Sequence, residues 1–257
     1  MNYSNIIENM TWSYSRINSF FTCPYQFYLK YVLSSRSQKQ FFSDYGSFMH
    51  KILEKHLLGD LSKEEAIQYY CDNYNTEIQG IAPNKKISSN YFRQGYRYLE
   101  NMNFDNETLA VEHEVRFKLA DKYEFVGIID RVSRTKDGTI LVDDHKSKTL
   151  SPRSMKKQSS LKNKELDEYL RQLYLYSIPV AEEFGQPKYL RFNCFRTQTW
   201  ITEPFKTEDF LRTQEWAILA IQTIISNEDW SPDMEYWKCK YICDQHENCD
   251  YYLMNER

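Results

Sequence analysis

Residues 127 to 148 read GIIDRVSRTKDGTILVDDHKSK and predict a β-hairpin. Two arms rich in aliphatic and β-branched residues, 125–132 and 139–145, flank the turn signal Lys136-Asp137-Gly138, which is typical of antiparallel pairs. The second arm ends in Asp-x-Lys, formed by Asp144 and Lys146. The rest of the prediction is built outward from this hairpin.

The length of the turn decides whether two acids of the hairpin share a face. Side chains alternate between faces along a strand. A two-residue loop at Asp137-Gly138 would place Asp130 opposite His145, so that Asp130 and Asp144 point to different faces. A three-residue loop, a type I turn followed by Gly138 in the left-handed conformation, places Asp130 directly across from Asp144. We predict the three-residue loop.

The composition indicates a globular chain. The 257 residues are 41% hydrophobic, which is ample for a buried core, and seven Gly and seven Pro argue against a disordered or fibrous chain. The net charge of −3 excludes a global nucleic-acid signature, so any DNA contact must come from a local patch. The 21 tyrosines suit stacking on nucleic acid, although a coding bias would give the same enrichment.

Neither a membrane span nor a leader is evident in the sequence. There is no run of eighteen apolar residues, and the first ten residues lack a basic region and an apolar core. We therefore expect a soluble, cytoplasmic protein with no membrane partner. In a reducing cytosol the six cysteines are not expected to form a disulfide framework, so clustered ones are candidate metal ligands.

Helical spacing dominates the first hundred residues. Residues 13–33 predict two short helices that meet near Cys23, with Ser15 as a candidate cap and Pro24 in the first turn of the second helix. Further helices are expected over residues 46–58, 62–74 and 88–102. In the first of these, Gly46, His50 and Glu54 fall on one stripe.

The pattern then changes to strands. Three consecutive antiparallel strands are expected over residues 108–119, 123–132 and 138–145. Residues 146–164 hold seven Lys or Arg and no acid, which predicts a mobile basic loop that attracts phosphate or a plain solvated loop. The candidate DNA contacts in it are Lys148, Arg153, Lys156 and Lys157.

Beyond the loop we expect a helix over residues 166–184 that carries Gln172 and Tyr176. Strands are expected over 189–196 and 199–205, and a helix over 207–226 with Thr207 as its cap. No internal repeat or low-complexity linker forces a boundary. We therefore predict an α/β fold and a single domain over 1–257, with a mainly helical part (1–105), a core (106–226) and a cysteine-bearing tail (227–257).

The hairpin carries the chemistry of phosphodiester hydrolysis. Asp130 and Asp144 can hold Mg²⁺ or Mn²⁺, because these ions prefer hard oxygen ligands. Lys146 shares the face of Asp144 and can orient water or neutralise a phosphate. Alone, Asp-x-Lys is a weak motif, since exposed acidic and basic residues often produce it.

An ordered set of motifs strengthens this interpretation. The set comprises His50 in Gly-Ser-Phe-Met-His, Gly127-x-x-Asp130, Asp144-His145-Lys146-Ser147 and Gln172-Leu-Tyr-Leu-Tyr176. It resembles the RecB-like branch of the PD-(D/E)XK nucleases in order and approximate spacing. The opening Ser-Arg-Ile-x-x-Phe-x-x-Cys-Pro-x-x-Phe-Tyr-Leu-x-Tyr is similar to the same branch, as found in AddB-type subunits and in CRISPR-associated and phage exonucleases. The resemblance spans residues 13–249.

The resemblance implies a restriction-endonuclease-like core, with a central mixed sheet flanked by helices and an N-terminal helical region stapled to the C-terminus. It implies metal ligation by His50, Asp130 and Asp144, with the His145 carbonyl as a further ligand. Lys146 would be the catalytic lysine, and Gln172 and Tyr176 would orient it or contact the DNA backbone. Glu114 is a weaker match to a family acid. Ordinary helix-face roles remain the alternative for His50, Gln172 and Tyr176.

Four cysteines form a second constellation. Cys23 stands far from Cys239, Cys243 and Cys249, and the arrangement resembles the four-iron, four-sulphur staple of AddB-type and CRISPR-associated members. The x3 spacing between the first two of the triplet departs from the x2 expected there. Zinc on the same cysteines, or with His246 replacing one, and free thiols are the alternatives. Cys71 and Cys194 are expected to be buried apolar residues.

These features predict a metal-dependent DNA exonuclease acting in phage or bacterial recombination or repair. Its partners would be linear DNA and a recombinase or helicase, because the chain has no Gly-x-x-x-x-Gly-Lys-Ser/Thr run of its own for a motor. The alternative is a non-catalytic nucleic-acid-binding or recombination-partner module with a nuclease-like fold.

Overall fold

The computed structural model describes residues 3–154 and 161–255. The described elements are, in chain order, α1 (Ser4–Glu8), α2 (Tyr14–Thr22), α3 (Pro24–Phe27), the π-helical turn η1 (Tyr28–Val32), α4 (Phe41–Leu57), α5 (Lys63–Glu77), α6 (Lys85–Asn101), β1 (Glu107–Leu119), β2 (Tyr123–Arg134), β3 (Ile140–Lys146), α7 (Leu161–Glu183), β4 (Pro187–Cys194), β5 (Thr199–Pro204), α8 (Thr207–Ile225), α9 (Tyr236–Tyr241), the 3₁₀ turn η2 (His246–Asn248) and α10 (Asp250–Asn255). No helix among the described residues combines the length and apolarity that crossing a bilayer requires.

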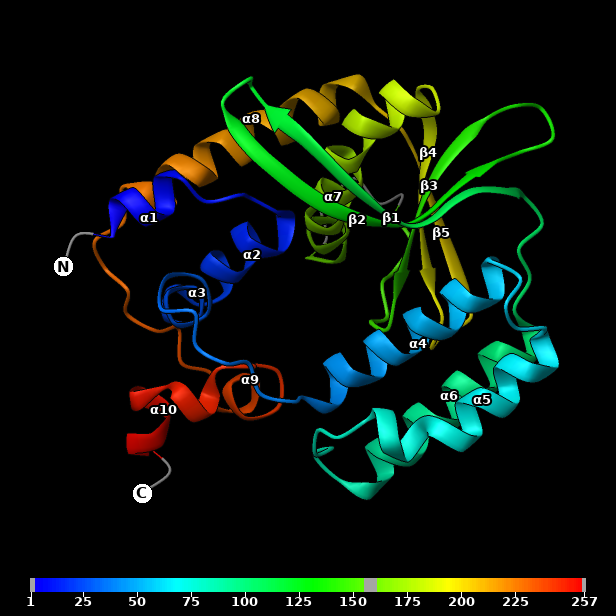
Figure 1. Cartoon of the computed structure of the whole chain (residues 1–257), viewed down its shortest axis with the longest axis horizontal. Helices are drawn as coiled ribbons and strands as arrows, with labels where there is room; N and C mark the ends of the chain where they lie inside the picture. The colour runs from blue at the N-terminus through cyan, green and yellow to red at the C-terminus, as the bar shows by residue number, and fades with distance from the viewer. Residues whose placement is uncertain (1–2, 155–160, 256–257) are drawn as a thin grey trace.

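The described strands form one mixed sheet in the order β1-β2-β3-β4-β5. Neighbouring strands are antiparallel except β3 and β4, which run parallel and are joined through α7. Parallel neighbours need a crossover connection, and α7 is that crossover. It packs against the sheet and contacts β1, β2, β3 and β4 (Figure 1). The predicted α/β class, a central mixed sheet flanked by helices, is confirmed.

The turn between β2 and β3 has the predicted length. Arg131 pairs with Asp143 and Arg134 with Ile140, which is the register that a three-residue loop imposes. Gly138 has φ of +84° and donates its N–H to the carbonyl of Thr135. The three-residue loop with a left-handed glycine is therefore confirmed.

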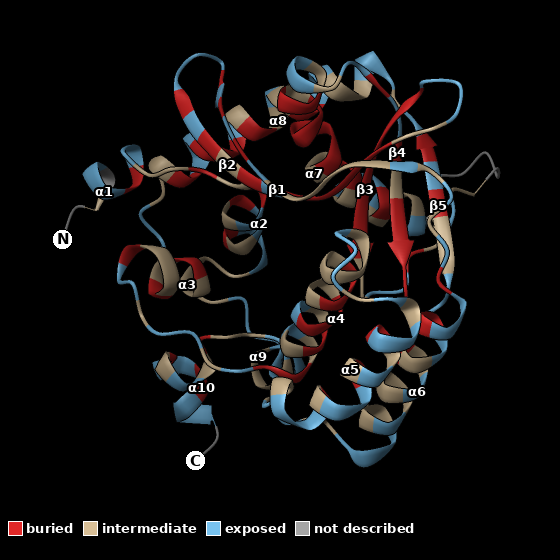
Figure 2. Ribbon diagram, turned by 45° about the vertical axis from the view of Figure 1, so that its right-hand side comes forward, coloured by how far each residue is buried: buried red, intermediate tan, exposed pale blue. Residues whose placement is uncertain are grey.

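Buried residues of β3 hold the hairpin in place (Figure 2). The face opposite the two acids carries Asp143, which is 0% exposed and bound by Arg131 at 3.0 Å and by Arg191 at 2.6 Å. Burial lowers the pKa of Arg131, and Asp143 acts in the opposite sense. Asp143 is thus a structural acid, although Asp144 follows it directly in the sequence.

The helical part packs α4 against α5 and α6 through one apolar stripe. The buried residues of α4 recur every three or four positions, as an amphipathic helix requires; they are Phe41, Tyr45, Phe48, Met49, Ile52 and Leu53. The stripe with Gly46, His50 and Glu54 is left to line a groove beside the sheet. His50 faces the sheet because the opposite side of α4 packs against α5 and α6.

The two ends of the chain lie together, as Figure 1 shows for α3, α9 and α10. Lys30 forms an ion pair of 2.5 Å with Asp244. The amide of Gln40 donates to the carbonyl of Cys243 at 3.0 Å, and Asn248 donates to the carbonyl of Arg36 at 2.9 Å. These contacts join the N-terminal helical region to the C-terminal tail.

Three local predictions are corrected by the structure. Ser13, not Ser15, caps α2 by accepting the N–H of Arg16, because the helix begins at Tyr14 and encloses Ser15. Thr207 is the first helical residue of α8 and does not cap it. Helix α7 already begins at Leu161, so the end of the expected basic loop is helical.

Candidate functional site

The site begins where β2 and β3 separate. Their pairing ends at Arg131 and Asp143, one residue before the two acids. There the carboxylate of Asp130 accepts the backbone N–H of His145 at 2.5 Å, a donor that continued pairing would otherwise engage. A buried N–H needs a partner. Asp130 therefore satisfies this N–H at the point where the two strands separate, which we call the fork in the sheet, and it also faces the groove.

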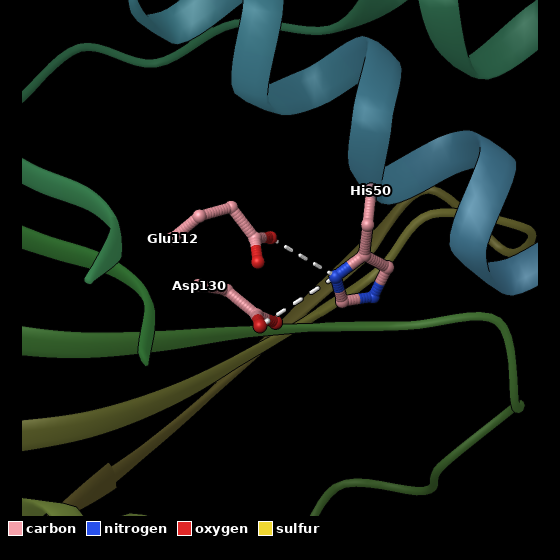
Figure 3. Close-up of side chains that lie close together, drawn as sticks. All are labelled: His50, Glu112 and Asp130. Atoms are coloured by element: carbon pink, nitrogen blue, oxygen red, sulfur yellow. Dashed lines mark ion pairs between the residues drawn. The ribbon is translucent and has the colours of Figure 1, made fainter. Parts of the chain in front are cut away.

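His50 reaches this fork from α4. Its Nδ1 lies 3.4 Å from Oε1 of Glu112 and 3.5 Å from Oδ1 of Asp130 (Figure 3). Its Nε2 donates to the carbonyl of His145 at 2.8 Å. This hydrogen bond leaves Nδ1 to face the two carboxylates, which is how an oriented imidazole serves as a metal ligand. The His145 carbonyl, predicted as a further ligand, thus binds His50.

Glu112 is a site residue that the sequence interpretation missed. The register of β1 and β2 places it across from Asp130, between the pairs Val111–Arg131 and His113–Ile129. It has φ of +43°, an uncommon conformation for a residue with a side chain.

Glu114, the acid singled out from the sequence, is exposed and pairs with Arg116 at 2.7 Å. It therefore lies outside the cluster. Side chains two residues apart share a face of a regular strand, but the left-handed backbone at Glu112 interrupts that alternation. The length of the turn over 120–122 fixes the register of β1 against β2. The sequence does not reveal this turn, because its left-handed residues are Ala120 and Asp121, where a glycine would have indicated it.

The donor set fits a hard divalent cation. Among the described residues, His50, Glu112 and Asp130 are the group of three whose ligand atoms all lie within 4.8 Å of one another. One imidazole nitrogen with carboxylate oxygens suits Mn²⁺ or Mg²⁺. Asp144 is not part of this group, since its carboxylate turns toward Lys146. Of the predicted trio, the structure brings His50 and Asp130 together, with Glu112 beside them, and places Asp144 next to Lys146.

The charges of the cluster are strongly coupled. Burial acts to raise the pKa of Asp130, but His50 outweighs it and holds that pKa at about 2. Burial likewise acts to lower the pKa of His50, while Asp130 and Glu112 raise it well above its usual value. Without metal, His50 therefore carries the proton that neutralises part of the acid charge.

Lys146 is held by a chain of polar groups. Its Nζ lies 3.0 Å and 2.8 Å from the two oxygens of Asp144 and 3.1 Å from Oε1 of Gln172. The amide of Gln172 donates in turn to the hydroxyl of Tyr176 at 3.1 Å. Burial acts to lower the pKa of Lys146, but Asp144 raises it overall, so the ammonium stays charged. Gln172 thus contacts the lysine directly, and Tyr176 contacts Gln172 but not the lysine.

Burial has the opposite result for Asp144. It raises the pKa of this carboxyl to about 6, against the lowering effect of Lys146. A carboxylate that is costly to keep charged gains from a nearby cation, and a bound metal would supply one.

Gly127 makes room for Tyr176. A Cβ at position 127 would lie 2.3 Å from Cε1 of the Tyr176 ring, far inside van der Waals contact. The glycine of the Gly-x-x-Asp motif therefore has a steric role, because it admits the ring that holds Gln172, and the acid of the motif belongs to the candidate metal site.

A groove of about 480 Å³ opens along α4 above the cluster. Its lining residues are Phe42, Ser43, Gly46, Ser47, His50, Lys51, Glu54, Glu112 and Ser147. Small polar side chains and a glycine along α4 let a polar ligand approach His50 closely.

The predicted basic loop is only partly described. Lys148 pairs with Glu165 at 2.6 Å. Arg153 pairs with Asp167 at 2.6 Å and with Glu203 at 2.8 Å, and these ion pairs tie the loop to α7 and β5. Lys156 and Lys157 lie outside the described residues. Contacts of this loop with DNA remain a prediction.

The four predicted cluster cysteines line one small pocket. Cys23 lies between α2 and α3, and Cys239, Cys243 and Cys249 come from the tail; His246 lines the same pocket. No three of these thiols lie within 4.8 Å of one another, although all four are among the described residues. Of the other cysteines, Cys194 is buried as expected, whereas Cys71 is exposed.

Comparison with known proteins identifies the relatives of this chain. The model of the PD-(D/E)XK nuclease superfamily matches residues 11–250. One subunit of the ATP-dependent helicase/deoxyribonuclease from Streptococcus agalactiae, in serotypes Ia, V and III, is 26% identical over 153 residues. This match covers 52% of the chain and 14% of the relative's length.

A solved structure has the same fold. A crystal structure described as a candidate exonuclease from Eubacterium rectale superposes with a TM-score of 0.50, at 14% identity. The match covers 98% of this chain and 90% of the other. At this identity the likeness bears on the fold alone.

Proposed function

We propose that this chain, which belongs to the PD-(D/E)XK nuclease superfamily, is an exonuclease that hydrolyses DNA with a bound Mg²⁺ or Mn²⁺ ion. One observation carries the proposal. The cluster of His50, Glu112 and Asp130 opens into a groove, and a partly buried, charged Lys146 is fixed beside it.

Each residue has a separable task in this proposal. His50, Glu112 and Asp130 would hold the ion, with the buried Asp144 carboxylate as the further acid offered to it, and the ion would polarise the scissile phosphate and activate water. The ammonium of Lys146 neutralises charge that develops on the phosphate. Gln172 and Tyr176 fix the position of that ammonium. His50 would have to lose its proton for Nδ1 to hold the ion.

The loop after β3 would contact the DNA backbone. Lys148 and Arg153 pair with acids that phosphates can replace, and Lys156 and Lys157 add charge to the same stretch. Each phosphate contact made by such residues releases counterions, so affinity should fall with salt concentration.

The four cysteines would hold a [4Fe-4S] cluster that joins the chain ends. Tetrahedral zinc, with Zn–S bonds of about 2.3 Å, needs its thiolates roughly 3.8 Å apart. No three of the thiols in this pocket lie within 4.8 Å of one another, and a [4Fe-4S] cluster, being larger than a zinc ion, suits the wider spacing better. Visible absorption and an iron content of four per chain, after anaerobic purification, would support the cluster. Stoichiometric zinc in its place would contradict the cluster and support a zinc site.

The biological setting follows from the relatives by analogy. The chain spans about a seventh of the length of the streptococcal proteins, whose name includes helicase activity. We propose that a helicase or recombinase supplies DNA to this nuclease in the cytoplasm of a bacterium, or of a bacterium infected by a phage.

The test is cleavage of end-labelled linear DNA with Mn²⁺. Wild-type protein should degrade it, and Asp130→Asn and Lys146→Ala should reduce the rate by about 10²-fold or more, in line with the loss of groups that stabilise charge in a transition state. Full activity in either variant would overturn the assignment. Metal-independent binding without cleavage by wild-type protein would favour the non-catalytic module instead.

A further inference from the structure

A continuous wall of planar side chains leads from the site toward the tail. Arg196 donates to the carbonyl of Ser147 at 3.2 Å, and its guanidinium lies 3.7 Å from the centre of the Tyr91 ring. Tyr91 contacts Phe42, with ring centres 5.3 Å apart, and Phe42 contacts Trp237 at 5.8 Å. Phe42 also lines the groove that holds His50. The wall thus joins the groove to α9.

Trp237 ends this wall with its indole partly open to solvent. It is 45% exposed, which is unusual for so large an apolar side chain. Phe42 and Tyr241 are its ring neighbours, tilted by 40° and 52°. Neither lies parallel on the indole, so an additional flat group can stack on it.

Two lysines follow the indole closely in the chain. Helix α9 carries Lys238 and Lys240 and no acid. Its Glu235 neighbour pairs with Lys238 at 2.6 Å and is the main cause of the raised pKa of that lysine, while Lys148 of the basic loop acts in the opposite sense. A phosphate beside the indole would meet the charge of Lys238 and Lys240, although Asp233 and Glu235 lie next to them in the chain.

We propose that Trp237, backed by Phe42, stacks a base of single-stranded DNA whose backbone follows the α4 groove to His50. Phe42 and His50 are eight residues apart on one helix, or roughly 12 Å. Aromatic platforms select unpaired bases, because a base inside a duplex already has both faces covered. This inference rests on the proposed function and adds to it a preference for single strands.

The experiment measures binding and cleavage separately. Single-stranded oligonucleotides with 2-aminopurine scanned through each position are titrated into the Lys146→Ala protein, which does not consume them. The same titration is made with Trp237→Ala and Trp237→Phe in that background, and with a blunt duplex. Tyr189→Ala is the matched control: this tyrosine is 40% exposed, and it pairs with Leu141, at the end of β3 away from Lys146.

Fluorescence should be quenched at one position of the single strand. Trp237→Ala should abolish that quench and weaken single-strand binding by about 10-fold, within the range of one lost base stack. Trp237→Phe should keep most of both, and Tyr189→Ala and duplex binding should be unchanged.

Two results would overturn the inference: unchanged single-strand affinity in Trp237→Ala, or equal loss for single strands and duplex. If Trp237→Ala does not fold, the positional quench in the parent protein decides alone. A wild-type protein that binds single strands through Trp237 but never cleaves DNA would refute the proposed nuclease activity and leave the stacking site standing.

Discussion

Replacement of Gly127 by alanine should disable the site without touching any charged residue. The added Cβ would lie 2.3 Å from the Tyr176 ring, so the ring must move by roughly 1 Å or more to reach ordinary contact. That movement pulls the Tyr176 hydroxyl from Gln172, whose other end holds Lys146. A misplacement of about 1 Å in a catalytic group can cost about 10²-fold in rate.

The stability cost should be smaller than the catalytic cost. Overpacking of this kind typically costs about 1–3 kcal/mol, and denaturant unfolding will measure it. Activity is read as the single-turnover rate on end-labelled DNA with saturating Mn²⁺. We expect a loss of about 10²-fold in rate from a protein that remains folded at the assay temperature.

A double-mutant cycle separates the steric cause from other effects. With Tyr176→Ala the obstruction disappears, so Gly127→Ala should then cost less than about 0.5 kcal/mol in stability and little further activity. With Tyr176→Phe the ring remains, and Gly127→Ala should cost as much as it does in the wild type. Additive effects of Gly127→Ala and Tyr176→Ala would refute the steric argument.

Three further predictions follow from the site. Glu112→Gln should weaken Mn²⁺ binding, measured by calorimetry, and DNA cleavage by at least about 10-fold, whereas Glu114→Gln at its exposed neighbour should change neither. Equal effects of the two substitutions would remove Glu112 from the proposed metal site. Asp143→Ala should lower stability by about 3–5 kcal/mol, because it leaves the buried Arg131 and the partly buried Arg191 without their partner. Asp144→Ala should abolish cleavage in a folded protein, and denaturant unfolding that finds Asp144→Ala the more destabilising of the two would contradict these roles. Mn²⁺ affinity should rise with pH, because Asp130 and Glu112 raise the pKa of His50 well above its usual value and the proton must leave before Nδ1 binds metal. Calorimetry from pH 6 to pH 8 that finds constant affinity would contradict this prediction.

The parts of the fold set by local rules were predictable from the sequence. The turn at Gly138 follows from the conformational freedom of glycine, and once its length is known the register of Asp130 and Asp144 follows as well. The fold class and the helix after the basic loop follow from the period of the apolar residues in the same way.

Features set by distant partners were not predictable. Glu112 became a site residue through its register against β2 and its left-handed backbone, neither of which has a signal in the sequence around it. The composition of the basic loop likewise gave no sign that Arg153 would meet Asp167 and Glu203, which come from later elements of the chain. The number of charged residues in a segment does not predict which residues of other elements will pair with them.

The fork in the sheet gives Asp130 two duties that a single substitution can confuse. Alanine would remove a metal ligand and would also strand the N–H of His145, a loss of about 1–3 kcal/mol for a buried donor. Asparagine keeps an oxygen for that N–H and removes only the negative charge. An inactive alanine variant would therefore not distinguish lost chemistry from a sheet that has closed or shifted, and natural variation at this position should be restricted to side chains that offer an acceptor.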